Sequence, residues 1–244
     1  MDKLKVCHLY PDLLNLYGDR GNIIAMQKRL EWRGLGFEFT GISVGDSFNA
    51  SDFDLIFIGG GQDFEQEVLL ADLSADKKKS ISNAVESGIS FLAICGGYQL
   101  LGTHYTSWNG VQFDFCGAIN IYTIGHEKRM IGDFMFTCLD QPISSLTVSG
   151  FENHSGKTYL GNGVRPLGTI IKGFGNNGED KTAGARYKNV FCSYSHGPVL
   201  PKNPRLCDFI LETALTKKYG DYSLEPIDNA IEDSAGGYVI DRLS

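Results

Sequence analysis

The sequence predicts an α/β protein with a doubly wound, mostly parallel sheet and helices on both faces. Short apolar runs alternate with segments of helical pattern in the first part of the chain, which is typical of such sheets. Two of these runs lead directly into glycine-rich turns, at Gly59–Gly61 and Gly96–Gly97. Sites in doubly wound sheets lie beyond the carboxyl ends of the strands. Both turns therefore predict a site at one edge of the sheet.

The first half of the chain supplies most of the predicted sheet. Ser74 is a suitable cap for a helix, and Gly88 stands just past the end of that helix. The strands are predicted at Leu4–Tyr10, Phe37–Val44, Leu55–Ile58 and Ile89–Ile94, and the helices at Asn22–Trp32 and Ser74–Glu86.

The second half is richer in β-pattern. Its short runs are interrupted by Gly, Asn and Pro, and they are Val111–Thr123, Met130–Thr137, Leu146–Ser149, Leu167–Lys172 and Ala183–Ser193. A helix is predicted at Arg205–Lys218, and the tail 223–244 is acidic and then apolar. The simplest interpretation is one domain over residues 1–244 that continues from a parallel into a mixed sheet.

Composition excludes several classes of function. A net charge of −7 over 244 residues argues against nucleic acid as a partner. The 6 cysteines form no Cys-x-x-Cys pair, so neither a disulfide framework nor a metal site is expected. No signal peptide is expected, and no apolar run is long enough to span a membrane. A cytoplasmic protein without membrane insertion is expected.

Cys95 is the predicted nucleophile. It ends a buried apolar run and precedes Gly96, Gly97 and the start of a helix. A strand–turn–helix elbow exposes such a side chain, and the helix start favours an anionic thiolate. The alternative is a structural cysteine in the core, the interpretation we give to the other five: Cys7, Cys116, Cys138, Cys192 and Cys207.

A nucleophilic cysteine needs a base and an oxyanion hole. His196 follows the run that ends near Ser193, and it competes for the role of base with His154. A turn histidine that only caps backbone groups is an equally good interpretation of His196 from position alone. The backbone N–H groups of Gly60, Gly61 and Gly96 are candidates for the oxyanion hole. The triple glycine by itself is a weak signal, because a tight turn also uses it.

These motifs together resemble a known family. Cys95-Gly96-Gly97-Tyr98-Gln99, the upstream glycine loop and His196 are similar to the class I glutamine amidotransferase domain, which has a flavodoxin-like fold and a Cys–His–Glu triad. The segment Gly150–Gly156 is similar to the branch that includes cobyric acid synthase. The resemblance implies that Cys95 attacks the side-chain amide of glutamine and that Gln99 helps to bind the substrate.

Three further segments, 10–22, 173–180 and 194–204, are similar to the amidotransferase subunits of lipid II isoglutaminyl synthases. This resemblance covers nearly the whole chain. It implies that Arg129 holds the α-carboxylate of L-glutamine, a task that suits a guanidinium. It also implies a heterodimer with a Mur-ligase-like synthase subunit, which binds ATP and Mg and uses the ammonia to amidate the D-glutamate of lipid II.

Other functions stay open at this point. The chain has no Gly-x-x-x-x-Gly-Lys-Ser/Thr loop, so no P-loop ATP site, and no cofactor at all, is expected in it. An amidotransferase subunit for another acceptor, as in cobyric acid synthases, is the nearest alternative. An inactive binding or regulatory subunit on the same fold and a cysteine peptidase are further alternatives.

The acid that orients His196 is not evident from the motif. The family places it two residues after the histidine, where this chain has Pro198. Two sources are then open: Glu152 within the chain, or a carboxylate that the partner donates across the interface. We favour the partner, because a site completed only by docking would prevent the loss of ammonia.

Overall fold

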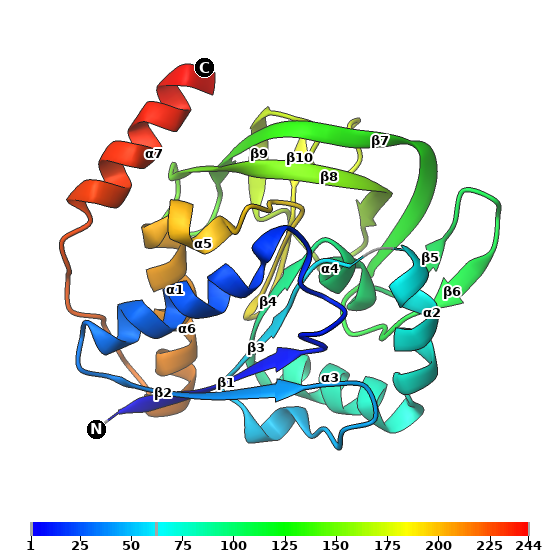
Figure 1. Cartoon of the computed structure of the whole chain (residues 1–244), viewed down its shortest axis with the longest axis horizontal. Coiled ribbons are helices and arrows are strands. Elements are labelled where there is room, and N and C mark those ends of the chain that lie inside the picture. Colours follow the sequence, from blue (N-terminus) through cyan, green and yellow to red (C-terminus); the bar gives the residue numbers. More distant parts are fainter. Residues whose placement is uncertain (1, 62, 244) are drawn as a thin grey trace.

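The computed structural model describes residues 2–61 and 63–243, with the backbone alone at 63–67. One sheet has six strands in the order β11-β12-β4-β3-β1-β2 (Figure 1). All its neighbours run parallel except β11 and β12. The strands are β1 Lys3–Leu9, β2 Gly36–Ile42, β3 Leu55–Ile58, β4 Ser90–Ile94, β11 Ala185–Tyr187 and β12 Val190–Ser193. The prediction of a mostly parallel α/β sheet is confirmed.

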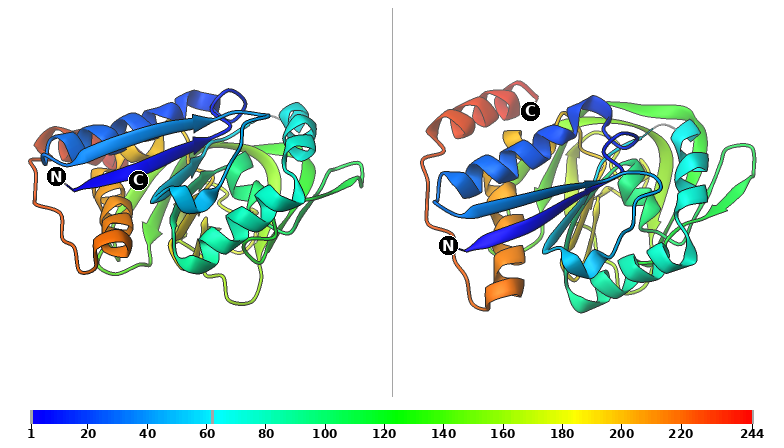
Figure 2. Two further views of the ribbon diagram at one scale, coloured as in Figure 1. Left: turned by 90° about the horizontal axis from the view of Figure 1, so that it is seen from below. Right: turned by 60° about the horizontal axis from the view of Figure 1, so that its bottom comes forward.

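Helices cover both faces of this sheet. From β1 the chain crosses to β2 on one side, and from β3 it crosses to β4 on the other. Right-handed crossovers therefore place the intervening helices on opposite faces. In Figures 1 and 2, α1 (Arg20–Glu31) and α6 (Pro204–Tyr219) lie on one side of the strands and α3 (Ala75–Ser87) on the other. Helix α2 (Asp63–Asp72) precedes α3 and is an element that the sequence did not reveal.

The reversal of direction between β1 and β3 is the switch point at which doubly wound sheets place their sites. The loop after β1 contains a single 3₁₀ turn, Leu16–Gly18, and the glycines Gly59–Gly61 follow β3. A second 3₁₀ turn, Ala50–Asp52, precedes β3. The ends of β4 and β12, with Cys95 and His196, lie on the same edge of the sheet, because β4 pairs in parallel with both β3 and β12.

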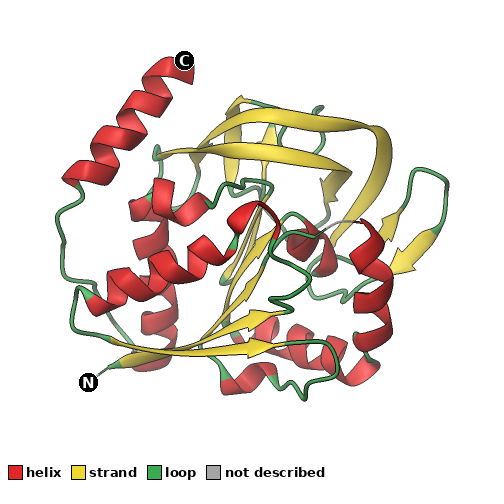
Figure 3. Cartoon of the chain, viewed as in Figure 1, coloured by secondary structure: helices red, strands yellow, loops and turns green. Residues whose placement is uncertain are grey.

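Most β-rich runs of the second half form a separate sheet. Its order is β10-β9-β7-β5-β6, and β8 pairs with β7. The strands are β5 His104–Thr106, β6 Gln112–Asp114, β7 Ile121–Cys138, β8 Thr147–Leu160, β9 Gly168–Lys172 and β10 Thr182–Ala183. Strands β7 and β8 form a long curved hairpin along the upper side in Figure 3. The expected single mixed sheet is thus wrong in part, since only β11 and β12 extend the first sheet.

The two sheets meet at the predicted site. The backbone N–H of His196 donates to the carbonyl of Phe151 on β8 at 2.7 Å, and the reverse bond is 3.2 Å long. This isolated antiparallel bridge joins the residue after β12 to the middle of β8. One apolar core extends from β1, β3 and β4 to Phe134 and Phe136 of β7. The hairpin is therefore placed against the edge where Cys95 lies.

The tail ends in α7 (Ala230–Leu243), which stands apart at the upper left of Figure 1. None of its described residues is buried. Arg205, near the start of α6, donates to Asp233 of α7 at 3.1 Å. Helix α5 (Val199–Lys202) contacts α1, which is distant in the sequence, and α6, which follows it directly. Within the described residues, no helix is both long enough and apolar enough to cross a bilayer.

Candidate active site

Cys95 lies at a strained elbow between β4 and α4 (Gly96–Leu100). Its φ of 50° and ψ of −104° are rare for a residue with a side chain. Such strain, of order 1–3 kcal/mol, persists only where the surroundings impose it. The Cys95 N–H donates to the carbonyl of Ser193 at 2.9 Å, and Gly97 N–H donates to the carbonyl of Gly59 at 3.0 Å. The elbow is therefore fixed by the ends of two neighbouring strands.

His196 and Cys95 are brought together, as the sequence predicted. Cys95 lies close enough to His196 to raise the pKa of the imidazole. The Nε2 atom of His196 forms no hydrogen bond within residues 2–61 and 63–243. Catalytic hydrogen bonds often tighten only when substrate is bound. The close packing depends on Gly60, because a methyl group there would lie 2.6 Å from Cε1 of His196 and 3.3 Å from Cβ of Cys95. A side chain at Gly60 would displace the base from the nucleophile.

The carboxylate that contacts His196 is Asp19, which the sequence analysis did not identify. Asp19 Oδ1 lies 3.3 Å from Nδ1 of His196, and both side chains are fully buried. Asp19 comes from the loop after β1, which ends at the same sheet edge as Cys95. A hydrogen bond at Nδ1 holds the ring so that Nε2 faces away from the acid. The order along the site is therefore Asp19, His196, Cys95.

These neighbours change the protonation of His196. Burial by itself lowers the pKa of an imidazole, since it penalises the charged form. The hydrogen bond to Asp19 and the contact with Cys95 act in the opposite direction and prevail, so the pKa of His196 is raised from 6.5 to about 10. The imidazolium is thus the resting form at neutral pH. A charged His196 can neutralise an anionic thiolate and can give a proton to a leaving amine.

Two amides are available for an oxyanion. The N–H groups of Gly61 and Gly96 form no hydrogen bond among the described residues, and a methyl group on Gly96 would lie 3.1 Å from Gly61 N. Gly60 does not fit the same role, contrary to the prediction. Its N–H donates to Asp19 Oδ2 at 2.8 Å and so holds the acid. The geometry therefore favours Gly61 and Gly96.

Glu152 does not contact His196, so its expected role as orienting acid disagrees with the geometry. Neighbouring residues on a strand point to opposite faces, and Phe151 is the residue that pairs with His196. The Glu152 carboxylate is instead bound by the N–H groups of Phe174 and Gly175. It anchors the loop after β9 against β8. The favoured alternative, a carboxylate from a partner chain, is not required by the geometry either, because Asp19 of this chain already contacts Nδ1 of His196.

His154 lies within a buried polar cluster and not at the nucleophile. Its ring is stacked on Tyr194, with centroids 3.6 Å apart, and its Nε2 is 3.3 Å from Glu152. Gln99, predicted to bind substrate, is also buried, and its side-chain N–H donates to the Tyr194 hydroxyl at 3.1 Å. The geometry gives Gln99 a supporting contact behind Cys95. Its role toward substrate stays a prediction.

Arg129 is exposed at the rim of the site. Its Nε donates to Asn153 Oδ1 at 2.8 Å, and the Asn153 amide donates to the hydroxyl of Tyr17. The Tyr17 ring packs against His196 with centroids 4.8 Å apart. Arg129 is thus linked to the base through two side chains. Neither Tyr17 nor Asn153 was singled out from the sequence.

The other cysteines are buried, as predicted. Burial raises the pKa of the Cys7, Cys116 and Cys138 thiols to about 12, and it also raises that of Cys192 and Cys207. These thiols stay protonated at neutral pH and are poor nucleophiles.

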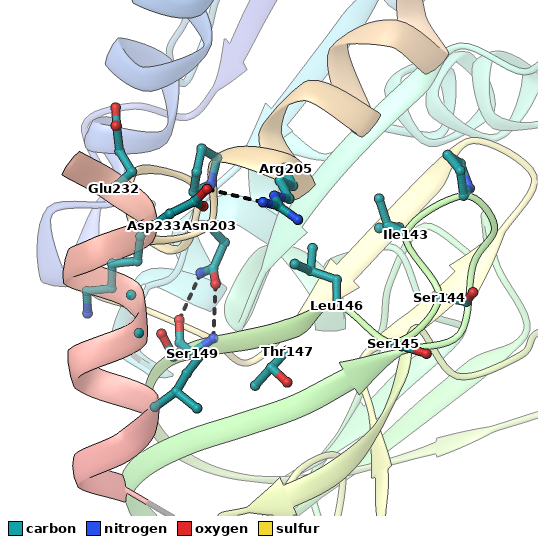
Figure 4. Close-up of a pocket in the computed structure, with 16 residues that line it drawn as sticks. Ile143, Ser144, Ser145, Leu146, Thr147, Ser149, Asn203, Arg205, Glu232 and Asp233 are labelled. Carbon is teal, nitrogen blue, oxygen red and sulfur yellow. Dashed lines mark hydrogen bonds and ion pairs between the residues drawn. The ribbon is translucent and has the colours of Figure 1, made fainter. Parts of the chain in front are cut away.

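A separate hollow of about 500 Å³ lies between α7, the start of α6 and the connection from β7 to β8 (Figure 4). The Arg205–Asp233 ion pair crosses this hollow. The Asn203 side chain donates to the carbonyl of Ser149 at 2.9 Å and accepts from its N–H at 3.0 Å. None of the predicted site residues lines this hollow.

Comparison with known proteins shows the family to which the chain belongs. Residues 5–204 match the CobB/CobQ-like glutamine amidotransferase domain. The glutamine-hydrolysing subunit GatD of lipid II isoglutaminyl synthase from Streptococcus pneumoniae is 42% identical over 219 residues, which cover 89% of this chain and 83% of that protein. The corresponding subunit from Staphylococcus aureus is 38% identical over 244 residues, which cover 100% of this chain and 98% of that protein.

The fold has a solved counterpart. A glutamine amidotransferase from Thermotoga maritima superposes with a TM-score of 0.54 at 15% identity, over 98% of this chain and 93% of that one. The fold is that of a class I glutamine amidotransferase. The chain belongs to the CobB/CobQ-like glutamine amidotransferase family, and the enzyme class expected from the sequence is confirmed.

Proposed function

We propose that this protein hydrolyses glutamine as the amidotransferase subunit of a lipid II isoglutaminyl synthase in the cytoplasm. The observation that carries the chemistry is the contact of a strained Cys95 with a His196 that Asp19 keeps charged. The two GatD relatives, each a named subunit of that synthase, support the choice of acceptor.

The first half-reaction forms a thioester. Arg129 binds the α-carboxylate of glutamine, and the Cys95 thiolate attacks the γ-carbonyl carbon. The carbonyl oxygen becomes an oxyanion that accepts hydrogen bonds from Gly61 and Gly96, and losing one such donor typically costs about a hundredfold in rate. His196 gives its proton to the nitrogen, the C–N bond breaks, and ammonia leaves. Cys95 then carries the γ-glutamyl group.

The second half-reaction releases glutamate. His196 is now neutral and takes a proton from water, which attacks the thioester carbonyl. The C–S bond breaks, and glutamate and the thiolate–imidazolium pair are restored. Asp19 keeps the ring oriented in both steps.

The ammonia then serves a Mur-ligase-like partner. That subunit would bind ATP and Mg and amidate the D-glutamate of lipid II, which gives this protein a place in peptidoglycan synthesis. In this proposal the protein is one subunit of a heterodimer and binds no cofactor itself.

The experiment measures glutamate release from glutamine by wild type and by Cys95→Ser, with and without the synthase. We expect glutamate release by the wild type and none by Cys95→Ser. The circular dichroism of Cys95→Ser should be unchanged. Full activity in Cys95→Ser would end the proposal. Amidation of lipid II by the complex, tested beside other carboxylate acceptors, decides the acceptor.

A further inference from the structure

Asn153 connects two side chains that come from distant parts of the chain. It lies on β8, and its Oδ1 and its carbonyl oxygen accept bonds from Arg129 at 2.8 and 3.3 Å. Its Nδ2 donates to the hydroxyl of Tyr17. We call these three residues the Asn153 bridge. Each polar atom of the Asn153 side chain is used, and each holds a different partner.

Tyr17 is placed over the base by a loop in a disfavoured conformation. Its φ of 55° is left-handed, and Gly18 follows with a φ of 74°. A left-handed tyrosine costs about 1–2 kcal/mol, so contacts elsewhere must compensate. Those contacts are the Tyr17 hydroxyl on Asn153 and its ring on His196. The loop is therefore shaped to hold this ring at the mouth of the site.

Arg129 is directed to the same place by an irregularity of the hairpin. The pairing of β7 with β8 goes from Gly125 opposite Gly156 to Met130 opposite His154. Residues 126–129 therefore lie opposite the single residue Ser155. Bulges of this kind redirect side chains and are frequent next to active sites.

The bulge leaves the Arg129 side chain exposed to solvent. Its Nη1 donates to no group, and no acidic side chain forms an ion pair with it, within the described part of the chain. A fixed guanidinium with a free edge is suited to bind a carboxylate. Because Asn153 holds both Nε and Nη2, the free edge has one orientation relative to Tyr17 and thus to His196.

We propose that Asn153 is a positioning residue that fixes Arg129 and Tyr17 as one rigid rim, and so sets the distance between the α-carboxylate and the Cys95 thiolate. This inference rests on the proposed function. A fixed distance makes the site select a substrate whose amide lies at the right reach from its carboxylate, as in glutamine. Without Asn153 both side chains would move independently, and the alignment of glutamine on Cys95 would be lost.

The test compares two reagents that modify Cys95. The glutamine mimic 6-diazo-5-oxo-L-norleucine carries the α-carboxylate, and iodoacetamide does not. The second-order rate constants are measured on the full chain by mass spectrometry. Asn153→Leu removes the two side-chain hydrogen bonds at similar size, whereas Asn153→Asp keeps an acceptor for Arg129 and for the Tyr17 hydroxyl. Tyr159→Phe, which removes a 3.1 Å bond to Glu179 further along β8, is the matched control.

Asn153→Leu should slow the diazoketone about tenfold or more, as expected for lost hydrogen bonds to a charged group, and leave the iodoacetamide rate nearly unchanged. Asn153→Asp should retain most of the preference, and Tyr159→Phe all of it. If Asn153→Leu keeps the wild-type preference, or loses both rates equally, the inference is wrong while the proposed function stands. If the wild type shows no preference for the diazoketone, the proposed function fails, and the inference fails with it.

Discussion

Asp19→Asn tests the acid that the structure adds to the site. The substitution keeps the size of the side chain and an oxygen for the Gly60 N–H, but it removes the charge beside Nδ1 of His196. The rise of the His196 pKa from 6.5 to about 10 amounts to roughly 5 kcal/mol in favour of the imidazolium. Burial opposes this rise of the pKa, and the hydrogen bond to Asp19 is the largest of the interactions that produce it.

Removal of the charge should therefore lower the His196 pKa by at least about one unit, and the wrong ring orientation should lower kcat by about a hundredfold to ten-thousandfold. The assay is glutamate release as a function of pH, with the alkaline limb of kcat/KM as the readout. That limb should move to lower pH, because the imidazolium is lost earlier. Asp12→Asn is the control in the same loop: its carboxylate accepts a bond from Ser43 at 2.5 Å, and the variant should behave as the wild type.

Stability gives a second readout of Asp19. A raised pKa stabilises the folded state fully below pH 6.5, and this stabilisation disappears as the pH rises through about 10. The difference in unfolding free energy between wild type and Asp19→Asn should thus be largest below pH 6.5 and shrink toward pH 10. Unchanged kcat and an unchanged alkaline limb in Asp19→Asn would refute the assignment of Asp19.

Three further predictions follow from single contacts. Arg129→Ala should raise KM for glutamine with little change in kcat, because the carboxylate contact persists in the transition state; steady-state kinetics measures this, and an unchanged KM would remove Arg129 from the site. Glu152→Gln should leave the alkaline limb of kcat/KM in place and speed hydrogen exchange at Phe174, whose N–H donates a hydrogen bond to the carboxylate; a shifted limb would restore Glu152 as the orienting acid. Asp140→Asn should cost about 3–5 kcal/mol in urea unfolding, because it removes the negative charge that lies 2.9 Å from the buried Arg186 guanidinium; a loss below about 1 kcal/mol would contradict this.

Much of the fold was predictable because local pattern and tertiary context agree in the first half. The apolar run Leu55–Ile58 is a strand at the predicted bounds, and Cys95 lies at the predicted elbow. The second sheet was not predictable in the same way. The sequence shows a break between Thr123 and Met130, but β7 continues through it as a bulge, since pairing with β8 compensates for the irregularity.

The site was predictable where its residues are adjacent to glycine turns or belong to a known motif. Asp19 was missed although it lies in the family-like segment 10–22, because the sequence does not show which polar side chain of that loop faces His196. The role of Gly60 could not be foreseen, because the partner of one backbone N–H depends on a residue 41 positions away. Glu152 was misassigned for the opposite reason: it belongs to a family-like segment, but strand alternation turns its side chain away from His196.

The central claim, that Cys95 attacks glutamine, is tested most directly by trapping the thioester. The full chain is mixed with glutamine, quenched in acid within one turnover, digested and examined by mass spectrometry. The account predicts a γ-glutamyl group on the peptide that contains Cys95 in the wild type, in larger amount in His196→Ala supplied with an external proton donor, and in no other cysteine peptide. Steady glutamate release without any adduct at Cys95, or an adduct on another residue, would contradict it.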